Sequence, residues 1–281
     1  GIGDNTSKVT KYDNPNRTLT DPYEGQQLGE IWGYVVDGYF KTDEEARNYK
    51  VDQSFVNQMI NASALDNGLH AGDLKFVDLD GNNKIEQTTS ANDRKDMKVI
   101  GNSLPRYNYN FGISADWYGI DFSVLFQGIG KQNWYPGAET SMFWGPYSRP
   151  YASFIPSDFM SQVWSEENTD AYFPRPRGYV ALGSNRELAV VNTKYLQNLA
   201  YCRLKNLSIG YTLPDKWLSK IGFEKIRVYF SGENLLTFTK LHSDYIDPEQ
   251  ASASNSWKTS KSDANIYPWA KTYSFGVDIT F

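Results

Sequence analysis

Side chains that carry oxygen recur at every second position in the segment Asp78-Leu-Asp-Gly-Asn-Asn-Lys84. Asp78, Asp80 and Asn82 fit the first, third and fifth ligand positions of a calcium loop of the EF-hand type, and the carbonyl of Lys84 fits the seventh. Carboxylate and carbonyl oxygens are the ligands that hard cations such as Ca²⁺ prefer. The segment is therefore a candidate structural metal site.

Two positions of this loop depart from the calcium-binding pattern. Asn83 stands where glycine is usual, although asparagine tolerates the left-handed backbone required there. Thr89 stands where a bidentate glutamate is expected, so Glu86 or Asp93 would have to complete the ligand set. Two interpretations stay open: a bound structural Ca²⁺, or a turn in which Asp and Asn side chains hydrogen-bond to the local backbone.

Aromatic side chains are concentrated between positions 132 and 194, in a segment that prolines interrupt repeatedly. Flat aromatic rings can stack on sugars or anchor a partner protein, because aromatic residues dominate the energetic centres of interfaces. They can also form a small core of the segment itself or lie at the rim of a membrane. The candidates for substrate or partner contact are Trp134, Tyr135, Trp144, Tyr147 and Tyr151.

The sequence contains few of the residues and motifs that common enzymatic mechanisms require. His70 and His242 are the only histidines, and neither an H-E-x-x-H nor a G-x-S-x-G motif occurs. Cys202 is the only cysteine, which excludes an internal disulfide. The balance of 28 basic against 33 acidic residues, a net charge of −5, argues against a general nucleic-acid partner. We expect a protein that is not an enzyme.

Five segments alternate large apolar residues with small or polar ones, which is the period of a strand with one apolar face. They cover residues 107–117, 120–127, 206–213, 226–233 and 273–281. Tyr118-Gly119 joins the first two as a tight hairpin turn. Extending the alternation of the third strand backwards would put Lys205 and Arg203 on the apolar face, which predicts either a bulge there or a strand that has already left the apolar zone.

Two further elements are predicted upstream of these strands. Gly29 to Tyr34 is a strand with weaker alternation. Asp43 to about Ala64 is a helix, because Thr42 can cap it and three acidic residues suit its first turn.

The strands are joined by short turns at one end and by long segments at the other, about 41–104, 132–194 and 239–269. That asymmetry is typical of an outer-membrane β-barrel, with its long loops outside. The sequence has 20 Tyr, 15 Phe and 8 Trp, which suit the aromatic girdles of such a barrel. It has no apolar run near the roughly 20 residues of a membrane helix. The alternative is a secreted, soluble β-module that binds carbohydrate through aromatic residues.

Several motifs in shared order resemble one family, the SusC/RagA branch of the TonB-dependent outer-membrane transporters. The resemblance covers essentially the whole chain. The motifs are Gly29-Glu-Ile-Trp-Gly-Tyr34 with Asp37-Gly-Tyr-Phe40 and Thr42-Asp-Glu-Glu45; Gly72-Asp-Leu-Lys-Phe76 with Asp78-Leu-Asp-Gly81, Val99-Ile-Gly101 and Pro105-Arg-Tyr107; Trp164-Ser-Glu-Glu-Asn168 with Ala171 and Pro174-Arg175; Arg203-Leu-Lys-Asn-Leu207 with Gly210-Tyr211; and Ser231-Gly-Glu-Asn-Leu-Leu-Thr-Phe238 with Asp247-Pro-Glu249.

The resemblance implies a fold and a set of partners. The fold is an all-β, antiparallel transmembrane barrel, of which residues 1–281 would form the C-terminal part, roughly six strands of about 22. The remainder of the polypeptide would supply the other strands and a plug that engages TonB. A SusD-like surface lipoprotein would cover the barrel from outside, and a glycan fragment or a peptide would be imported across the outer membrane of a Gram-negative, Bacteroidetes-like cell.

Residue roles follow from this barrel. The polar strand faces would line the lumen and contact the plug or the solute, and the apolar faces would contact outer-membrane lipid. The terminal Phe281 resembles the signal that the barrel assembly machinery reads, on a strand that should pair with the strand around 227–237. The lumen-facing candidates are Asn108, Asn110, Asp116, Arg227, Tyr229 and Glu233.

Overall fold

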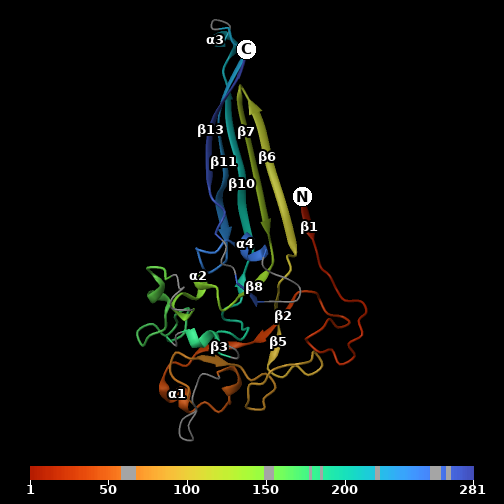
Figure 1. Ribbon diagram of the computed structural model, residues 1–281, viewed down its shortest axis with the longest axis vertical. Coiled ribbons are helices and arrows are strands. Elements are labelled where there is room, and N and C mark those ends of the chain that lie inside the picture. Colours follow the sequence, from red (N-terminus) through yellow and green to blue (C-terminus); the bar gives the residue numbers. More distant parts are fainter. Residues whose placement is uncertain are drawn as a thin grey trace.

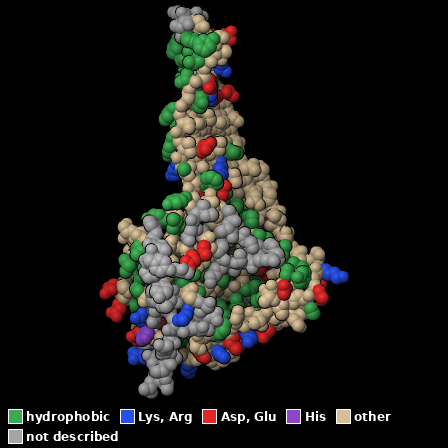
Figure 2. Space-filling model, in the orientation of Figure 1, with side chains coloured by type: hydrophobic (Ala, Val, Ile, Leu, Met, Phe, Trp, Pro, Cys, Tyr) green, Lys and Arg blue, Asp and Glu red, His purple; other side chains and the backbone are tan. Residues whose placement is uncertain are grey.

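The computed structural model describes residues 1–57, 68–148, 155–176, 179–183, 186–218, 222–253, 261–263 and 267–281. Two parts stand one above the other along the long axis of the molecule (Figure 1), and the space-filling view shows the same narrow upper part and broad lower part (Figure 2). A narrow antiparallel sheet, which we call the stem, rises from a broad mass of loops and short elements, which we call the body. Most of the long strands lie in the stem.

Six strands form the stem sheet in the order β1-β6-β7-β10-β11-β13. Every neighbouring pair is antiparallel. The predicted strands are confirmed, and so is the expected pairing of the last strand with the one before it, from Lys225↔Thr280 to Glu233↔Thr272. The strands are β1 (Ile2–Asp4), β6 (Tyr107–Trp117), β7 (Ile120–Ile129), β10 (Tyr201–Thr212), β11 (Lys225–Thr239) and β13 (Thr272–Thr280).

The two ends of the stem differ as the sequence predicts. At the far end Tyr118 and Gly119 turn β6 into β7, both with positive φ (48° and 84°), a conformation that favours glycine at the second position. The connection from β10 to β11 lies at the same end and includes α3 (Asp215–Leu218). The long segments all emerge at the other end, where they form the body (Figure 1).

A β-bulge interrupts the stem at Lys205. The pairing of β10 with both β7 and β11 shifts register between Leu204 and Asn206, so Lys205 has no direct partner. Because one extra residue reverses the alternation of faces, Arg203 points to the polar side rather than the apolar side. Of the two explanations open at this point of the sequence, the bulge is confirmed.

In the described residues, the body contains three small sheets and several short helices. Its strands are β2 (Glu30–Tyr34) with β5 (Met97–Asn102), β3 (Val36–Tyr39) with β4 (Leu74–Phe76), and β12 (Lys261–Ser262), β8 (Asn133–Pro136) and β9 (Gln197–Asn198). Its helices are α1 (Asp43–Arg47), α2 (Ser141–Trp144) and α4 (Pro248–Ala253), with 3₁₀ turns η1 (Ser54–Val56), η2 (Gly145–Tyr147), η3 (Phe159–Gln162) and η4 (Tyr179–Leu182).

The hydrophobic core lies in the body and not in the stem. Its main cluster gathers apolar residues from all three long segments, between Tyr34 and Ala251 in the chain. Aromatic rings dominate this cluster, with Phe173 stacked on Phe159 at 4.7 Å and on Tyr195 at 6.0 Å between ring centroids. The segments predicted as loops thus carry the interior of the described protein.

The helix predicted from Asp43 to about Ala64 is wrong in its length. The Oγ1 of Thr42 accepts the Glu45 amide at 3.1 Å as predicted, but α1 ends at Arg47. Tertiary contacts of Tyr49 override helical propensity here. Its ring packs edge-on against Phe40 and its hydroxyl donates to the Phe76 carbonyl at 2.9 Å. The part of the prediction that covers 58–67 lies outside the described residues.

No helix in the parts of the chain that the structure describes combines the length and the apolar character needed to cross a lipid bilayer.

Candidate functional site

One face of the stem is a continuous apolar surface. Residues directly opposite one another on neighbouring strands share a face, so the strand registers define apolar rows that run across the sheet. Many of these side chains are exposed, from 41% at Val228 to 83% at Phe275. The rows are Trp117, Ile120, Tyr211, Val228 and Val277; then Ala115, Phe122, Ile209, Phe230 and Phe275; then Ile113, Val124, Leu207, Gly232 and Tyr273.

The other face of the stem is polar. One row consists of serine on five successive strands: Ser114, Ser123, Ser208, Ser231 and Ser274. The six residues predicted from sequence to share a polar face lie on this side: Asn108, Asn110, Asp116, Arg227, Tyr229 and Glu233. The sheet thus presents two chemically opposite surfaces.

Arg227 joins three strands on the polar face. Its guanidinium pairs with Asp121 of β7 at 2.6 Å and with Asp278 of β13 at 3.3 Å. Gly210 of β10 lies beneath the first of these contacts, and a Cβ at that position would come within 2.4 Å of the Asp121 carboxylate. Glycine therefore leaves the space through which the two side chains meet.

The aromatic residues proposed for substrate or partner contact lie in the core. Trp134, Tyr135, Trp144 and Tyr147 are almost fully buried, and the hydroxyl of Tyr135 donates to the Leu188 carbonyl at 2.8 Å. Their rings have no surface left for an external ligand in this structure. The structure therefore corrects the contact hypothesis for these four residues and favours the alternative of a core within the segment. Tyr151 lies outside the described residues.

The acidic loop folds back on its own backbone. The two carboxylate oxygens of Asp78 accept the amides of Gly81 and Asn83, both at 2.7 Å. Asn83 has a φ of 63°, the left-handed conformation that the sequence requires of it. The Oδ1 of Asn82 accepts the Lys84 amide at 2.8 Å. These are the hydrogen bonds of an Asx turn, one of the two interpretations that the sequence left open. They also fix the directions in which the carboxylates point.

A third carboxylate, which sequence reasoning missed, completes an acidic cluster. Asp96 places a carboxylate oxygen so that one from each of Asp78, Asp80 and Asp96 lies within 4.8 Å of the others. The Asp96 oxygens accept the amides of Leu79 at 2.9 Å and Glu86 at 2.7 Å, which holds the residue beside the loop. No sequence pattern points to Asp96, because its distance from Asp80 fits no ligand spacing. Asp93 is not a member of this carboxylate cluster.

The electrostatics of the cluster favour a cation. Burial raises the pKa of the Asp96 carboxyl, the neighbouring carboxylates of Asp80 and Asp78 add to this, and two amide hydrogen bonds oppose it. For Asp78 the amides of Asn83, Gly81 and Asn82 outweigh the effect of burial and lower its pKa. A hard divalent cation relieves such crowding of negative charge, and each carboxylate oxygen keeps a lone pair for it. The residues present therefore fit Ca²⁺.

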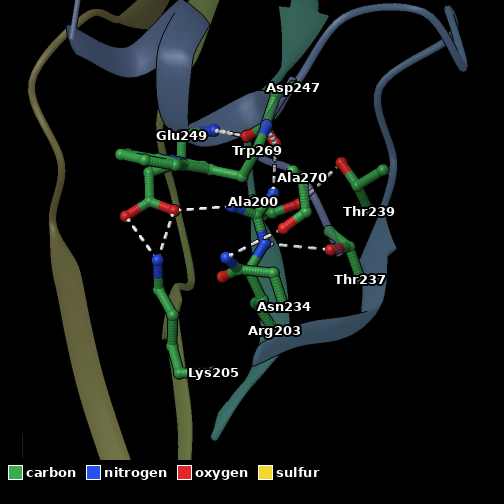
Figure 3. Close-up of polar contacts among 10 residues, drawn as sticks. All are labelled: Ala200, Arg203, Lys205, Asn234, Thr237, Thr239, Asp247, Glu249, Trp269 and Ala270. Atoms are coloured by element: carbon green, nitrogen blue, oxygen red, sulfur yellow. Dashed lines mark hydrogen bonds and ion pairs between the residues drawn. The ribbon is translucent and has the colours of Figure 1, made fainter. Parts of the chain in front are cut away.

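A buried charge cluster connects the polar face of the stem to the body (Figure 3). Arg203 is 2% exposed, and its guanidinium reaches Asp247 at 2.5 Å, Glu249 at 2.6 Å and the Thr237 hydroxyl at 2.9 Å. Lys205, the bulged residue, binds the same Glu249 carboxylate at 2.8 Å. Two motifs that lie far apart in the sequence, Arg-x-Lys and Asp-Pro-Glu, thus meet in space.

Local sequence explains how the acidic partners are presented. Asp247 precedes α4, and its Oδ1 accepts the Glu249 amide at 2.9 Å in the manner of a helix cap. Pro248 occupies the first helical position, where proline is favoured. The Oδ2 of Asp247 remains available for Arg203, and it also accepts the Trp269 amide at 3.3 Å.

Comparison with known proteins shows which proteins this chain resembles. No family model matches the sequence. TonB-dependent receptor P3 of Formosa agariphila is 28% identical over 264 residues, which cover 92% of this chain and 22% of the receptor. TonB-dependent receptor P39 of the same organism is 26% identical over 283 residues, which cover 92% of this chain and 25% of that receptor. The chain therefore spans only 22% to 25% of the length of these two relatives.

Solved structures agree on the fold. The structure of the RagAB peptide importer in the open-open state aligns with 96% of this chain. The alignment covers 24% of the importer chain, with a TM-score of 0.57 and 20% identity. The structure of the RagAB peptide transporter aligns with 97% of this chain, and the alignment covers 24% of the transporter chain, with a TM-score of 0.55 and 18% identity. Nearly the whole length of this chain is similar to one part of a TonB-dependent receptor. The resemblance to the SusC/RagA family is thereby confirmed.

Proposed function

We propose that this chain forms part of the barrel wall of a TonB-dependent importer in an outer membrane. The observation that carries the proposal is the exposure of the apolar face of the stem. Phe111, Ile113 and Val277 are at least half exposed, whereas polar side chains cover the opposite face. A strand sheet with lipid on one side and an aqueous lumen on the other requires this arrangement.

The soluble alternative requires the opposite packing. A secreted β-sandwich buries the apolar faces of its strands between two sheets. Among the described residues, the main core contains none of the apolar residues of the three stem rows. Contiguous exposed apolar surface of this extent marks a contact with lipid or another protein. The similarity to TonB-dependent receptors supports contact of this apolar face with lipid.

The orientation of the two faces can be measured in the full-length receptor. We would place a single spin label at Val277 on the apolar face or at Ser274 on the polar face, in a background from which Cys202 and every other cysteine of the full-length receptor have been replaced by serine, and reconstitute the receptor in lipid. We expect the label at 277 to be relaxed by dissolved oxygen, which concentrates in lipid, and the label at 274 by a water-soluble nickel complex. Equal access of the nickel complex to both labels would exclude the proposed orientation.

The family resemblance supplies the partners in this proposal. The remainder of the polypeptide would close the barrel, because open strand edges in lipid leave backbone groups unsatisfied. A plug would couple the barrel to TonB, and a SusD-like surface lipoprotein would cover the loop side. The imported solute would be a glycan fragment or a peptide. The body, which contains the predicted segments about 41–104, 132–194 and 239–269, would then face the outside of the cell.

We also propose that Asp78, Asp80 and Asp96 hold a structural Ca²⁺ that stabilises this outer part. Titration calorimetry of the full-length receptor should show Ca²⁺ binding that Asp96→Asn weakens by at least about tenfold, the loss typical of disturbing a metal site. The raised pKa of Asp96 should make the affinity fall on acidification at a higher pH than an ordinary aspartate would cause.

Asp93→Asn is the matched control for the calcium prediction. Sequence reasoning offered Asp93 as a ligand, but the structure leaves it out of the cluster, so this variant should bind Ca²⁺ like the parent. If Asp96→Asn retained the parental affinity, the calcium assignment would be wrong.

A further inference from the structure

The segment from Lys240 to Ala253, which we call the strap, lies against the polar face of the stem. Arg203, the residue of stem strand β10 that binds the strap, stands directly opposite Gln127 and Thr237 in the strand register. Gln127 in turn stands opposite Asn110, so all four belong to the polar face. Because Arg203 binds Asp247 and Glu249 from that face, the strap is on the same side as the serine row. Figure 1 shows its helix α4 at the end of β10 nearest the body.

Three independent sets of contacts hold the strap in place. The first is the buried cluster of Arg203 with Asp247 and Glu249 (Figure 3). The second is apolar: Leu241, Ile246 and Ala251 are buried members of the main core of the body. The third is a hydrogen bond of 2.8 Å from the Ser252 hydroxyl to the Gln132 side chain.

We propose that the strap is a fixed constriction at the outer mouth of the lumen and limits the size of what enters along this wall. The proposal rests on the proposed function, because the polar face is the lumen only if the apolar face meets lipid. Given that orientation, a segment bound to the polar face at the end nearest the body stands inside the mouth of the barrel. It narrows the passage between the body and the serine row.

The contacts indicate a constriction that stays in place, and not one that swings open. A mobile segment has few buried apolar contacts and exposed hydrogen bonds. The strap has the opposite character, since side chains at both of its ends are buried in the core. Moving it would also leave the Arg203 guanidinium, which has almost no contact with solvent, without its two carboxylates.

A cysteine placed behind the strap can report the size of the opening. Asn206 is exposed on the polar face, on the side of the bulge away from Arg203. In the full-length receptor with Cys202 and every other native cysteine replaced by serine, we would compare the labelling of Asn206→Cys by a small methanethiosulfonate and by a polyethylene-glycol maleimide of several kilodaltons on intact cells. Asp13→Cys, on an exposed part of the body, is the control that both reagents should label.

The strap is released by removing the charges as a set. The variant Arg203→Met with Lys205→Met, Asp247→Asn and Glu249→Gln leaves no unpaired charge in the cluster, because Lys205 would otherwise lose the Glu249 carboxylate that it binds. Removing both signs of charge together keeps the receptor able to fold. We expect the small reagent to label position 206 at similar rates in both backgrounds, and the large reagent to label it at least fivefold faster when the strap is released. Equal rates for the large reagent, or no labelling by either reagent, would overturn the proposal.

A crosslink separates a fixed constriction from a gate. Gln132→Cys and Ser252→Cys, oxidised to a disulfide before Asn206→Cys meets the large reagent, should restore exclusion in the released variant, because the oxidant leaves the single thiol at 206 free for the reagent. In the parent the same crosslink should leave growth on the imported nutrient unchanged. Loss of growth would show that the strap must move, which contradicts a fixed constriction. A failure of the barrel assignment itself would appear separately, in the spin labels at 274 and 277.

Discussion

Replacing Arg203 with alanine is expected to lower the free energy of unfolding by about 3 to 5 kcal/mol, the cost of leaving buried charges without their partner. Asp247 is 6% exposed and would lose the guanidinium that approaches it at 2.5 Å. Glu249 would keep only Lys205, at 2.8 Å. The loss can be measured as a lower denaturant midpoint, followed by protease cleavage near the strap, in the full-length receptor in detergent.

Arg106→Ala is the matched control for this prediction. Arg106 also makes a forked ion pair, with Asp4 at 2.9 and 3.2 Å, but the pair is exposed at the edge of the sheet. Exposed ion pairs contribute little to stability because water screens them, so the control should be close to the parent. Arg203→Lys should recover only part of the loss, because an ammonium cannot bind two carboxylates in the planar fork of arginine. Equal destabilisation by Arg203→Ala and Arg106→Ala would contradict the special role of burial.

The second large effect is expected from Val277→Arg on the apolar face. An arginine near the middle of a lipid-facing strand destabilises a membrane barrel by about 2 to 4 kcal/mol. Val277 is 58% exposed in the middle part of β13. The variant receptor should accumulate in outer membranes at a clearly lower level, and less of it should run as the compact folded form in unheated gel samples.

Ser274→Arg provides the comparison on the other face of the same strand. Ser274 is exposed in the serine row, where an arginine meets the aqueous side, so this variant should assemble like the parent. In a soluble β-module the apolar face would be buried against a second sheet, so Val277→Arg would destabilise that fold as well. The result expected of a lipid-facing strand is a loss of folded receptor from outer membranes for Val277→Arg together with normal assembly of Ser274→Arg, and equal membrane levels of the two variants would contradict it.

The stem could be predicted from the sequence because its signal is local. A strand between lipid and water must alternate along its length, and this alternation is visible in residues such as Tyr107 to Trp117 without any knowledge of their neighbours. The break in alternation at Lys205 was visible for the same reason, although sequence left two causes open and only the strand register shows that it is a bulge. The register between β6 and β7 follows once the turn at Tyr118-Gly119 is known.

The body could not be predicted in the same way, because long-range contacts decide its structure. The aromatic residues around Trp134 have no period, and only the three-dimensional packing shows that they form a core. The helix after Thr42 ends early because Tyr49 finds partners on Phe40 and Phe76. Asp96 joins the acidic loop through backbone amides, which a pattern of side chains cannot reveal.

The bulge at Lys205 makes the chain unequally tolerant of different kinds of sequence change. Substitutions along β10 alter one side chain at a time, but the deletion of one residue at the bulge would rotate everything beyond it by half a turn. Arg203 would then project into the lipid and Leu204 into the lumen, and the strap would lose its anchor in a single step. Descendants of this sequence can therefore drift residue by residue in this strand, while its length is effectively frozen.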